Sequence, residues 1–127
     1  MKYLGIDYGD KRVGIAISDP RGKIAFPRIT LLHNVGLIKN LESMVDTEKV
    51  SKIVVGLPIA FDGSDTEQSR KTRVFAEELK KNVNIPVDFE NEIFTTHLVE
   101  RAGVKKEHTD ESSAALILQS YLDKLKV

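Results

Sequence analysis

Cysteine and tryptophan are both absent from this sequence of 127 residues, and aromatic residues make up only 6% of it. The absence of cysteine excludes a disulfide scaffold, a thiol nucleophile and a metal site built from thiolates. So few aromatic side chains disfavour a broad stacking platform for nucleobases. The chain also lacks an excess of either charge, because 19 Lys and Arg residues balance 19 Asp and Glu residues. A protein that binds nucleic acid by bulk charge alone, as histones do, is therefore excluded.

Long apolar runs are missing as well. Asp7 interrupts the first apolar stretch before it is long enough for a signal peptide, and no stretch approaches the roughly 20 apolar residues of a membrane span. The sequence is 41% apolar and 30% charged, a balance typical of a globular protein. We therefore expect residues 1–127 to form one cytoplasmic domain that has no contact with a membrane.

The hydrophobic pattern predicts an α/β fold. Alternating apolar residues and turn signals indicate an antiparallel meander of three strands at residues 3–8, 13–18 and 23–32, with Pro27 placing the third strand at an edge. Further on, helices and strands alternate, which predicts one mixed five-stranded sheet with helices on both faces. These later elements are helices at residues 35–48, 64–82, 95–103 and from 109 onward, and strands at 53–57 and 86–92.

Two of the expected helices carry more detailed predictions. Ser64-Asp65-Thr66-Glu67 has the spacing of a capping box, so the second long helix should begin there. The buried face of this helix should comprise the stem of Arg70 with Val74, Phe75 and Leu79. The final helix should bury Ala114, Leu118, Tyr121, Leu122 and Leu125.

Three acidic residues stand at the ends of these elements: Asp7 and Glu92 each close a strand, and Asp110 opens the final helix. Each has an ordinary explanation, namely a hairpin turn for Asp7, a solvated strand for Glu92 and a helix N-cap for Asp110. If the first and fourth strands are neighbours, however, the three carboxylates meet at one edge of the sheet. Close carboxylates repel one another unless a cation lies between them. The joint placement therefore favours a Mg²⁺ site that acts on a phosphate.

Four groups of residues follow one another along nearly the whole chain. They are Gly5-Ile6-Asp7-Tyr8-Gly9-Asp10-Lys11-Arg12-Val13-Gly14, then Ile53-Val54-Val55-Gly56-Leu57-Pro58 with Asp62-Gly63, then Asn91-Glu92 with Thr95-Thr96, and finally Asp110 with Ile117-Leu118-Gln119-Ser120-Tyr121-Leu122. In this order and spacing they resemble the YqgF/RuvX family, whose members are predicted nucleases with an RNase H-like fold. The chain departs from the family in two places: Asn91-Glu92-Ile93 replaces the common Asp-Glu-Arg, and the loop of residues 103–109 is shorter than usual.

The resemblance implies a catalytic triad of Asp7, Glu92 and Asp110 that binds one or two divalent ions, Mg²⁺ or Mn²⁺. It also implies a nuclease that processes the 5′ end of pre-16S ribosomal RNA in ribosome biogenesis, or a Holliday junction resolvase that cuts four-way DNA junctions. Symmetric cutting of a junction requires two active sites, whereas a small neutral chain that acts as a monomer or weak dimer suits RNA. RNA is therefore the favoured substrate and branched DNA the alternative.

Basic residues near the three acids form the expected nucleic-acid surface, because Lys and Arg contacts to phosphate would position a strand over the metal. The candidates are Lys11, Arg12, Arg70, Arg73, Lys105 and Lys106. The other explanation for these residues is ordinary solvated charge. Neither half of the chain is strongly basic, so binding should be modest and sensitive to salt.

Two other classes of protein stay open. The Asp-x-Gly turn of Asp7 and Gly9 also occurs in actin-like sugar kinases and chaperone ATPases, but those need two such domains, and 127 residues provide one. A nucleic-acid-binding module without catalysis would leave all three acids idle. Such a module should bind nucleic acid equally well without Mg²⁺.

Overall fold

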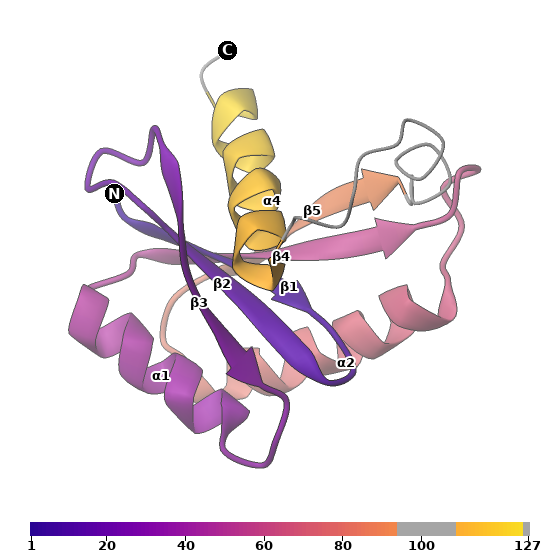
Figure 1. Cartoon of the computed structure of the whole chain (residues 1–127), viewed down its shortest axis with the longest axis horizontal. Coiled ribbons are helices and arrows are strands. Elements are labelled where there is room, and N and C mark those ends of the chain that lie inside the picture. Colours follow the sequence, from indigo (N-terminus) through magenta and orange to yellow (C-terminus); the bar gives the residue numbers. More distant parts are fainter. Residues whose placement is uncertain (94–108, 126–127) are drawn as a thin grey trace.

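The computed structural model describes residues 1–93 and 109–125, which form a five-stranded sheet with helices packed against it (Figure 1). In chain order the elements are β1 (Tyr3–Tyr8), β2 (Arg12–Ser18), β3 (Ala25–Leu32), α1 (Leu37–Glu48), β4 (Lys52–Ile59), α2 (Glu67–Asn82), β5 (Val87–Ile93) and α4 (Asp110–Lys124). The helix predicted at residues 95–103 lies outside the described residues. In the described ranges, no helix is long and apolar enough to cross a membrane.

The strand order is β3-β2-β1-β4-β5. Antiparallel pairing joins β1 to β2 and β2 to β3, which confirms the predicted meander, and Pro27 lies in the edge strand β3 as expected. Parallel pairing joins β1 to β4 and β4 to β5. Because β1, β4 and β5 run in the same direction, their carboxyl ends lie at one edge of the sheet.

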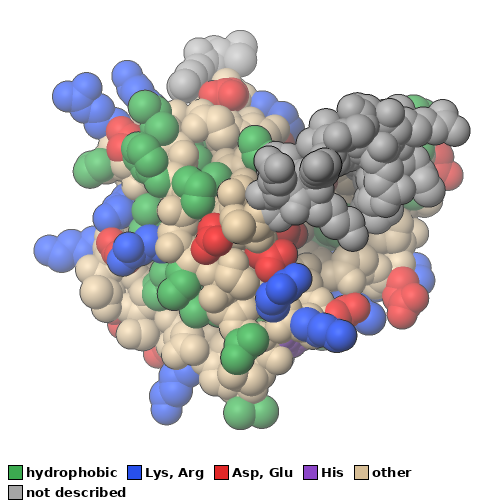
Figure 2. All heavy atoms as spheres, in the orientation of Figure 1, with side chains coloured by type: hydrophobic (Ala, Val, Ile, Leu, Met, Phe, Trp, Pro, Cys, Tyr) green, Lys and Arg blue, Asp and Glu red, His purple; other side chains and the backbone are tan. Residues whose placement is uncertain are grey.

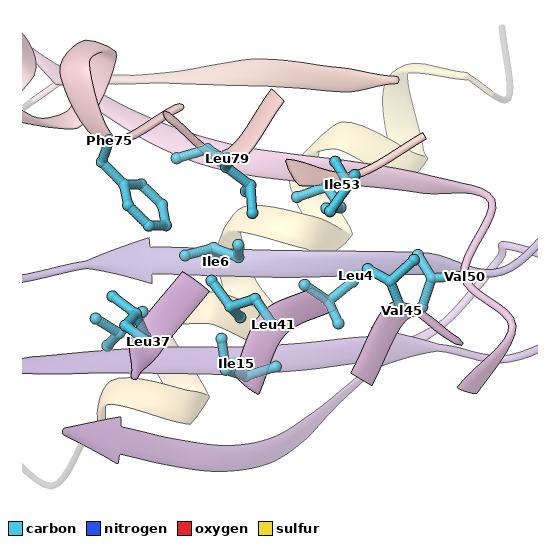
Figure 3. Packing of buried hydrophobic residues seen from close by; sticks show 13 residues of the cluster. Leu4, Ile6, Ile15, Leu37, Leu41, Val45, Val50, Ile53, Phe75 and Leu79 are labelled. Carbon is cyan, nitrogen blue, oxygen red and sulfur yellow. The ribbon is translucent and has the colours of Figure 1, made fainter. Parts of the chain in front are cut away.

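Helices cover both faces of this sheet, as predicted. On one face α1 and α2 pack against each other and bury Leu41 and Leu79 over Ile6, Ile15 and Ile53 of the strands (Figure 3). On the other face α4 lies across the strands, as Figure 1 shows, and forms a second core. Burial of each large aliphatic side chain contributes about 1.5–3 kcal/mol to the free energy of folding, so the second core holds α4 against its face of the sheet.

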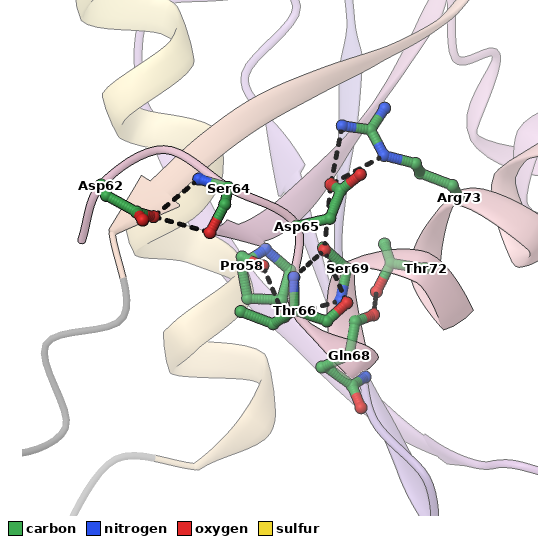
Figure 4. A network of polar contacts seen from close by, with 9 residues as sticks. All are labelled: Pro58, Asp62, Ser64, Asp65, Thr66, Gln68, Ser69, Thr72 and Arg73. Atoms are coloured by element: carbon green, nitrogen blue, oxygen red, sulfur yellow. Dashed lines mark hydrogen bonds and ion pairs between the residues drawn. The ribbon is translucent and has the colours of Figure 1, made fainter. Parts of the chain in front are cut away.

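The start of α2 differs from the prediction, because its N-cap is Thr66 and not Ser64. Thr66 Oγ1 accepts a hydrogen bond from the Ser69 amide at 3.0 Å, and Ser69 Oγ accepts one from the Thr66 amide at 2.6 Å (Figure 4). Ser64 instead donates its hydroxyl to Asp62 Oδ1 at 2.6 Å within the preceding turn. Thr66 Oγ1 also donates to the Pro58 carbonyl at 3.1 Å, which ties the start of α2 to the end of β4.

The buried face of α2 is also rotated relative to the prediction. Phe75 and Leu79 are buried as expected, but Arg70 is exposed and Val74 is 71% exposed. The buried face consists of Ser69, Thr72, Phe75, Ala76 and Leu79. The two hydroxyl residues tolerate burial because each donates a hydrogen bond to a carbonyl within the first turns of the helix, at 2.9 and 2.8 Å.

Helix α4 buries the predicted Ala114, Leu118, Tyr121 and Leu122, together with Ile117. The prediction is wrong for Leu125, which follows the last residue of the helix and is 53% exposed.

Candidate active site

Asp7 lies near the carboxyl end of β1, on the face of the sheet that α4 covers. Gly5 faces this helix, because a Cβ at Gly5 would lie only 2.8 Å from the Cβ of Leu118. Side chains alternate along a strand, so Asp7 points to the same face as Gly5. The Asp7 side chain is half-buried there.

Gly14 brings the start of α4 to Asp7. The antiparallel register of β1 and β2 places Gly14 directly opposite Asp7, so the two residues share a face of the sheet. A Cβ at Gly14 would overlap the main-chain carbonyl of Asp110, the first residue of α4. Only glycine leaves room for the helix at this point. The Thr109 side chain caps the helix by accepting a hydrogen bond from the Ser112 amide at 3.1 Å.

Glu92 reaches the same edge from β5. The parallel register pairs Gly56 of β4 with Glu90 of β5, and Pro58 with Glu92. A Cβ at Gly56 would lie 2.5 Å from Cδ1 of Ile117, so this row of residues faces α4. Glu90 confirms the direction, since its Oε2 accepts a hydrogen bond from Ser120 Oγ of α4 at 2.5 Å. Glu92 is two positions further along the strand and therefore also faces α4.

The electrostatics of the site connect the three acids. Burial, followed by the negative charge of Asp110, raises the pKa of Asp7 from its ordinary value of 3.8 to about 6. Burial is also the main reason that the pKa of Glu92 rises from 4.5 to about 7, followed by repulsion from Asp7 and then from Glu90. Asp7 thus interacts with both of the other acids.

Arg12 forms an ion pair with the carboxylate of Asp110. Its Nε atom lies 3.1 Å from Asp110 Oδ2, and the side chains are 66% and 35% exposed. In residues 1–93 and 109–125, no three His, Asp or Glu side chains are arranged as a ready set of metal ligands. The three acids therefore lie at the same edge of the sheet and interact electrostatically, while the carboxylate of Asp110 is paired with the guanidinium of Arg12.

The chemistry of these donors fits a divalent cation. Asp7, Glu92 and Asp110 offer carboxylate oxygens, the ligands that Mg²⁺ and Mn²⁺ prefer. Asp7 and Glu92 are half-buried, and the negative charge of Asp7 raises the pKa of Glu92. A cation held between them would remove that repulsion.

The predicted basic residues have different surroundings. Lys11 and Arg70 are exposed and make no ion pair with any described residue. Arg73 is held by Asp65, with Nη2 and Nε at 3.2 and 3.3 Å from Oδ1, and its guanidinium lies 5.7 Å from the centre of the Phe89 ring. Lys105 and Lys106 lie outside the described residues. On the face shown in Figure 2, basic and acidic side chains are interspersed, as the neutral composition predicts.

A family model described as RuvX, Holliday junction resolvase, matches residues 1–124. The chain belongs to the RuvX family. A protein of Sulfurihydrogenibium sp. named "Putative pre-16S rRNA nuclease" is 39% identical to it over 132 residues, which cover 98% of this chain and 91% of the relative. A protein of the same name from Nitratidesulfovibrio vulgaris is 38% identical and is matched over 97% of this chain and 94% of its own length.

Solved structures with the same fold include two resolvases. Thermus thermophilus RuvC in complex with a Holliday junction substrate matches with a TM-score of 0.58 at 15% identity, over 99% of this chain and 96% of RuvC. The Fowlpox virus resolvase in complex with Holliday junction DNA matches with a TM-score of 0.53 at 14% identity, over 98% and 99% of the two chains. The predicted RNase H-like fold is confirmed. Membership of the RuvX family also confirms the predicted class of enzyme, a nuclease that hydrolyses phosphodiester bonds.

Several contacts that hold the end of β1 in this RuvX-family chain had no signal in the sequence. Gln68 of α2 donates its side-chain amide to the Tyr8 carbonyl at 3.0 Å. The Tyr8 ring stacks on Phe75 with 4.2 Å between centroids, and its hydroxyl lies 3.1 Å from His33 Nε2. These partners are distant in sequence, so no local pattern could reveal them. They fix β1 from the face opposite Asp7.

Proposed function

We propose that this chain is a divalent-cation-dependent nuclease that processes the 5′ end of pre-16S ribosomal RNA, with Asp7, Glu92 and Asp110 holding the cation. The carrying observation is the electrostatic coupling of the acids: Asp110 raises the pKa of Asp7, and Asp7 raises the pKa of Glu92. This repulsion among acids at the carboxyl ends of β1 and β5 and at the start of α4 supports a shared cation, because neither Asp7 nor Glu92 pairs with a basic side chain in the described part of the chain.

The chain's own residues would hold the reactants. When bound, Mg²⁺ or Mn²⁺ supplies polarisation of the scissile phosphate and a lowered pKa of the attacking water. Asp7 and Glu92 would hold the cation from two strands of one rigid sheet, and Asp110 from the start of α4. Their partial burial strengthens the attraction for a cation by excluding bulk water.

Exposed cations would position the nucleic acid. Lys11 and Arg70 have no ion pairs in the described part of the chain, so their charges are available to phosphate oxygens. Arg12 lies beside Asp110 itself. Arg73 is less available to a phosphate, because it already forms an ion pair with Asp65. Lys105 and Lys106 complete the proposed set.

The names of the relatives favour RNA as the substrate. Proteins at 38–39% identity over nearly the full chain carry the name of a pre-16S rRNA nuclease. A four-way DNA junction is the second candidate, because the RuvX family is described as a Holliday junction resolvase. Symmetric cutting of a junction would require a dimer, whereas a single domain acting as a monomer or weak dimer in the cytoplasm suffices for RNA.

A direct comparison of the two substrates tests the proposal. The purified protein is incubated with Mg²⁺ or Mn²⁺ and either a labelled RNA that spans the 5′ precursor junction of 16S rRNA or a labelled four-way DNA junction. We expect cleavage of the RNA that stops when a chelator is added. Cleavage of the junction alone would establish the second candidate. Binding of both nucleic acids without cleavage, unchanged by metal, would contradict the enzyme and indicate a non-catalytic module.

A further inference from the structure

We propose that Arg12 and the divalent cation compete for the carboxylate of Asp110, and that binding of the cation releases the Arg12 guanidinium toward a phosphate of the substrate. The inference rests on the proposed function of this site. It gives Arg12 two successive partners, and therefore a positioning role that an ordinary phosphate contact such as Lys11 would not have.

Arg12 lies on the same face of the sheet as the three acids. Arg12 begins β2 two positions before Gly14, and alternation along the strand places both on the face that α4 covers. This is also the face of Asp7, which lies opposite Gly14. The guanidinium is thus on the same side of the sheet as the acids, with its Nε 3.1 Å from Asp110 Oδ2.

The ion pair of Arg12 and Asp110 is open to solvent. A polar pocket of about 260 Å³ opens at the pair, and Thr30, Thr109 and Glu111 complete its lining. A pocket of this size admits several water molecules, since one water occupies about 30 Å³ in the liquid. Arg12 is 66% exposed, so the side chain can leave Asp110 without disturbing the core. An ion and a phosphate can therefore reach the pair from solvent.

Electrostatics makes the two cations competitors. Two positive charges on one carboxylate repel each other, so each lowers the affinity of Asp110 for the other even when they use different oxygens. Asp7 adds a second negative charge near Asp110. A divalent ion held by two or three carboxylates gains more from this cluster than a monovalent guanidinium that meets one of them. Phosphate is the natural next partner of the released guanidinium, because Arg matches phosphate oxygens with paired donors.

The test is a double-mutant cycle on the affinity for Mn²⁺, measured by calorimetry without nucleic acid. The variants are Arg12→Gln, Asp110→Asn and the double variant. Removal of Arg12 should tighten Mn²⁺ binding by about two- to fivefold, as expected for a partly exposed ion pair. In the Asp110→Asn background the same removal should have no such effect. Arg28→Gln is the matched control, because Arg28 makes a similar exposed ion pair with Glu48 at 2.8 Å in β3 and α1.

A second readout has the opposite sign. At saturating Mn²⁺, Arg12→Gln should cleave nucleic acid more slowly than the wild type despite binding the ion more tightly. Thermal unfolding of every variant verifies that it is folded. Unchanged or weaker Mn²⁺ binding by Arg12→Gln overturns the competition, and tighter binding with unchanged cleavage overturns the release to phosphate. A wild type that binds Mn²⁺ but cleaves no nucleic acid contradicts the proposed function, while the calorimetric cycle still decides the competition. Absence of Mn²⁺ binding in every variant contradicts both.

Discussion

Gly14 lies directly opposite Asp7 across the β1–β2 pair, and the main-chain carbonyl of Asp110 fills the space that a Gly14 side chain would need. The approach of the two acids therefore depends on a residue that has no side chain. Any atom added there must push the start of α4 away from the strand end, because protein interiors are closely packed.

Gly14→Ala should separate the two acids. The added methyl group overlaps main-chain atoms and not a flexible side chain, so we expect a loss of about 1–3 kcal/mol in the free energy of unfolding. Displacement of Asp110 should also lower cleavage by about a hundredfold. Urea denaturation and a cleavage assay measure the two effects.

Gly36→Ala is the matched control for this prediction. A Cβ at Gly36 would meet only the exposed Asn34 Oδ1 at 3.4 Å, so its stability should change by less than about 0.5 kcal/mol. A Gly14→Ala protein as stable and active as the wild type would mean that α4 adapts freely.

The sequence predicts the sheet well, because strand patterns and turn residues are local signals. The neighbouring positions of β1 and β4 then bring Asp7 and Glu92 to one edge, as the prediction required. The pairing of Arg12 with Asp110 could not be predicted, since it depends on how closely α4 packs on Gly14.

The buried face of α2 differs from the predicted one for a different reason. A hydrophobic pattern favours Val74 as a core residue, but the helix instead buries Thr72, whose hydroxyl is satisfied by a carbonyl of its own helix. The sequence predicts too early a start for α2 because Ser64 and Thr66 both have the chemistry of an N-cap. The reciprocal hydrogen bonds between Thr66 and Ser69, and the bond from Thr66 Oγ1 to the Pro58 carbonyl, distinguish them.

Asp7→Asn should stabilise the protein at high pH and not at low pH. The folded state raises the pKa of Asp7 to about 6 and that of Glu92 to about 7, so it binds protons more tightly than the unfolded chain. The contribution of these groups to stability is therefore complete below about pH 4 and is lost as the pH rises through 6 to 7. At about pH 8, in chelator, we expect a gain of about 1–2 kcal/mol in Asp7→Asn. Thermal unfolding of wild type and Asp7→Asn at about pH 4 and about pH 8 checks this. An equal change in stability at both pH values would contradict the raised pKa of Asp7.

Thr66→Ala should destabilise α2 more than Ser64→Ala does. Loss of the Thr66 hydroxyl removes the cap on the Ser69 amide and the bond to Pro58, at a cost of about 1–2 kcal/mol. Ser64 lies in an exposed turn, so its replacement should cost less than about 0.5 kcal/mol. Chemical denaturation of both variants measures the difference. A larger loss of stability in Ser64→Ala than in Thr66→Ala would mean that Ser64 is the N-cap of α2.

Lys124→Met should expose the cost of a buried charge beside the active site. Glu90 is only 4% exposed, and its Oε2 lies 2.8 Å from Lys124 Nζ. Without this lysine the carboxylate keeps the Ser120 hydroxyl but loses its cation, and we expect a loss of about 1–3 kcal/mol by urea denaturation. Lys80→Met removes an exposed pair with Glu77 and a contact of Nζ with the Phe89 ring, 5.9 Å from its centre, and should change stability by less than about 1 kcal/mol. Equal effects of the two variants would show that Glu90 does not depend on Lys124.

In the proposed function, Asp7 acts on a phosphodiester through a divalent cation. The decisive experiment for this role of Asp7 is single-turnover cleavage of the labelled 16S precursor RNA, with wild type and Asp7→Asn purified and assayed side by side in Mn²⁺. We expect cleavage by the wild type that a chelator abolishes, and a rate lower by about a hundredfold or more in Asp7→Asn. Because this variant is expected to be at least as stable as the wild type at neutral pH, unfolding would not explain the loss. Cleavage by Asp7→Asn at the wild-type rate would show that Asp7 does not hold a catalytic cation.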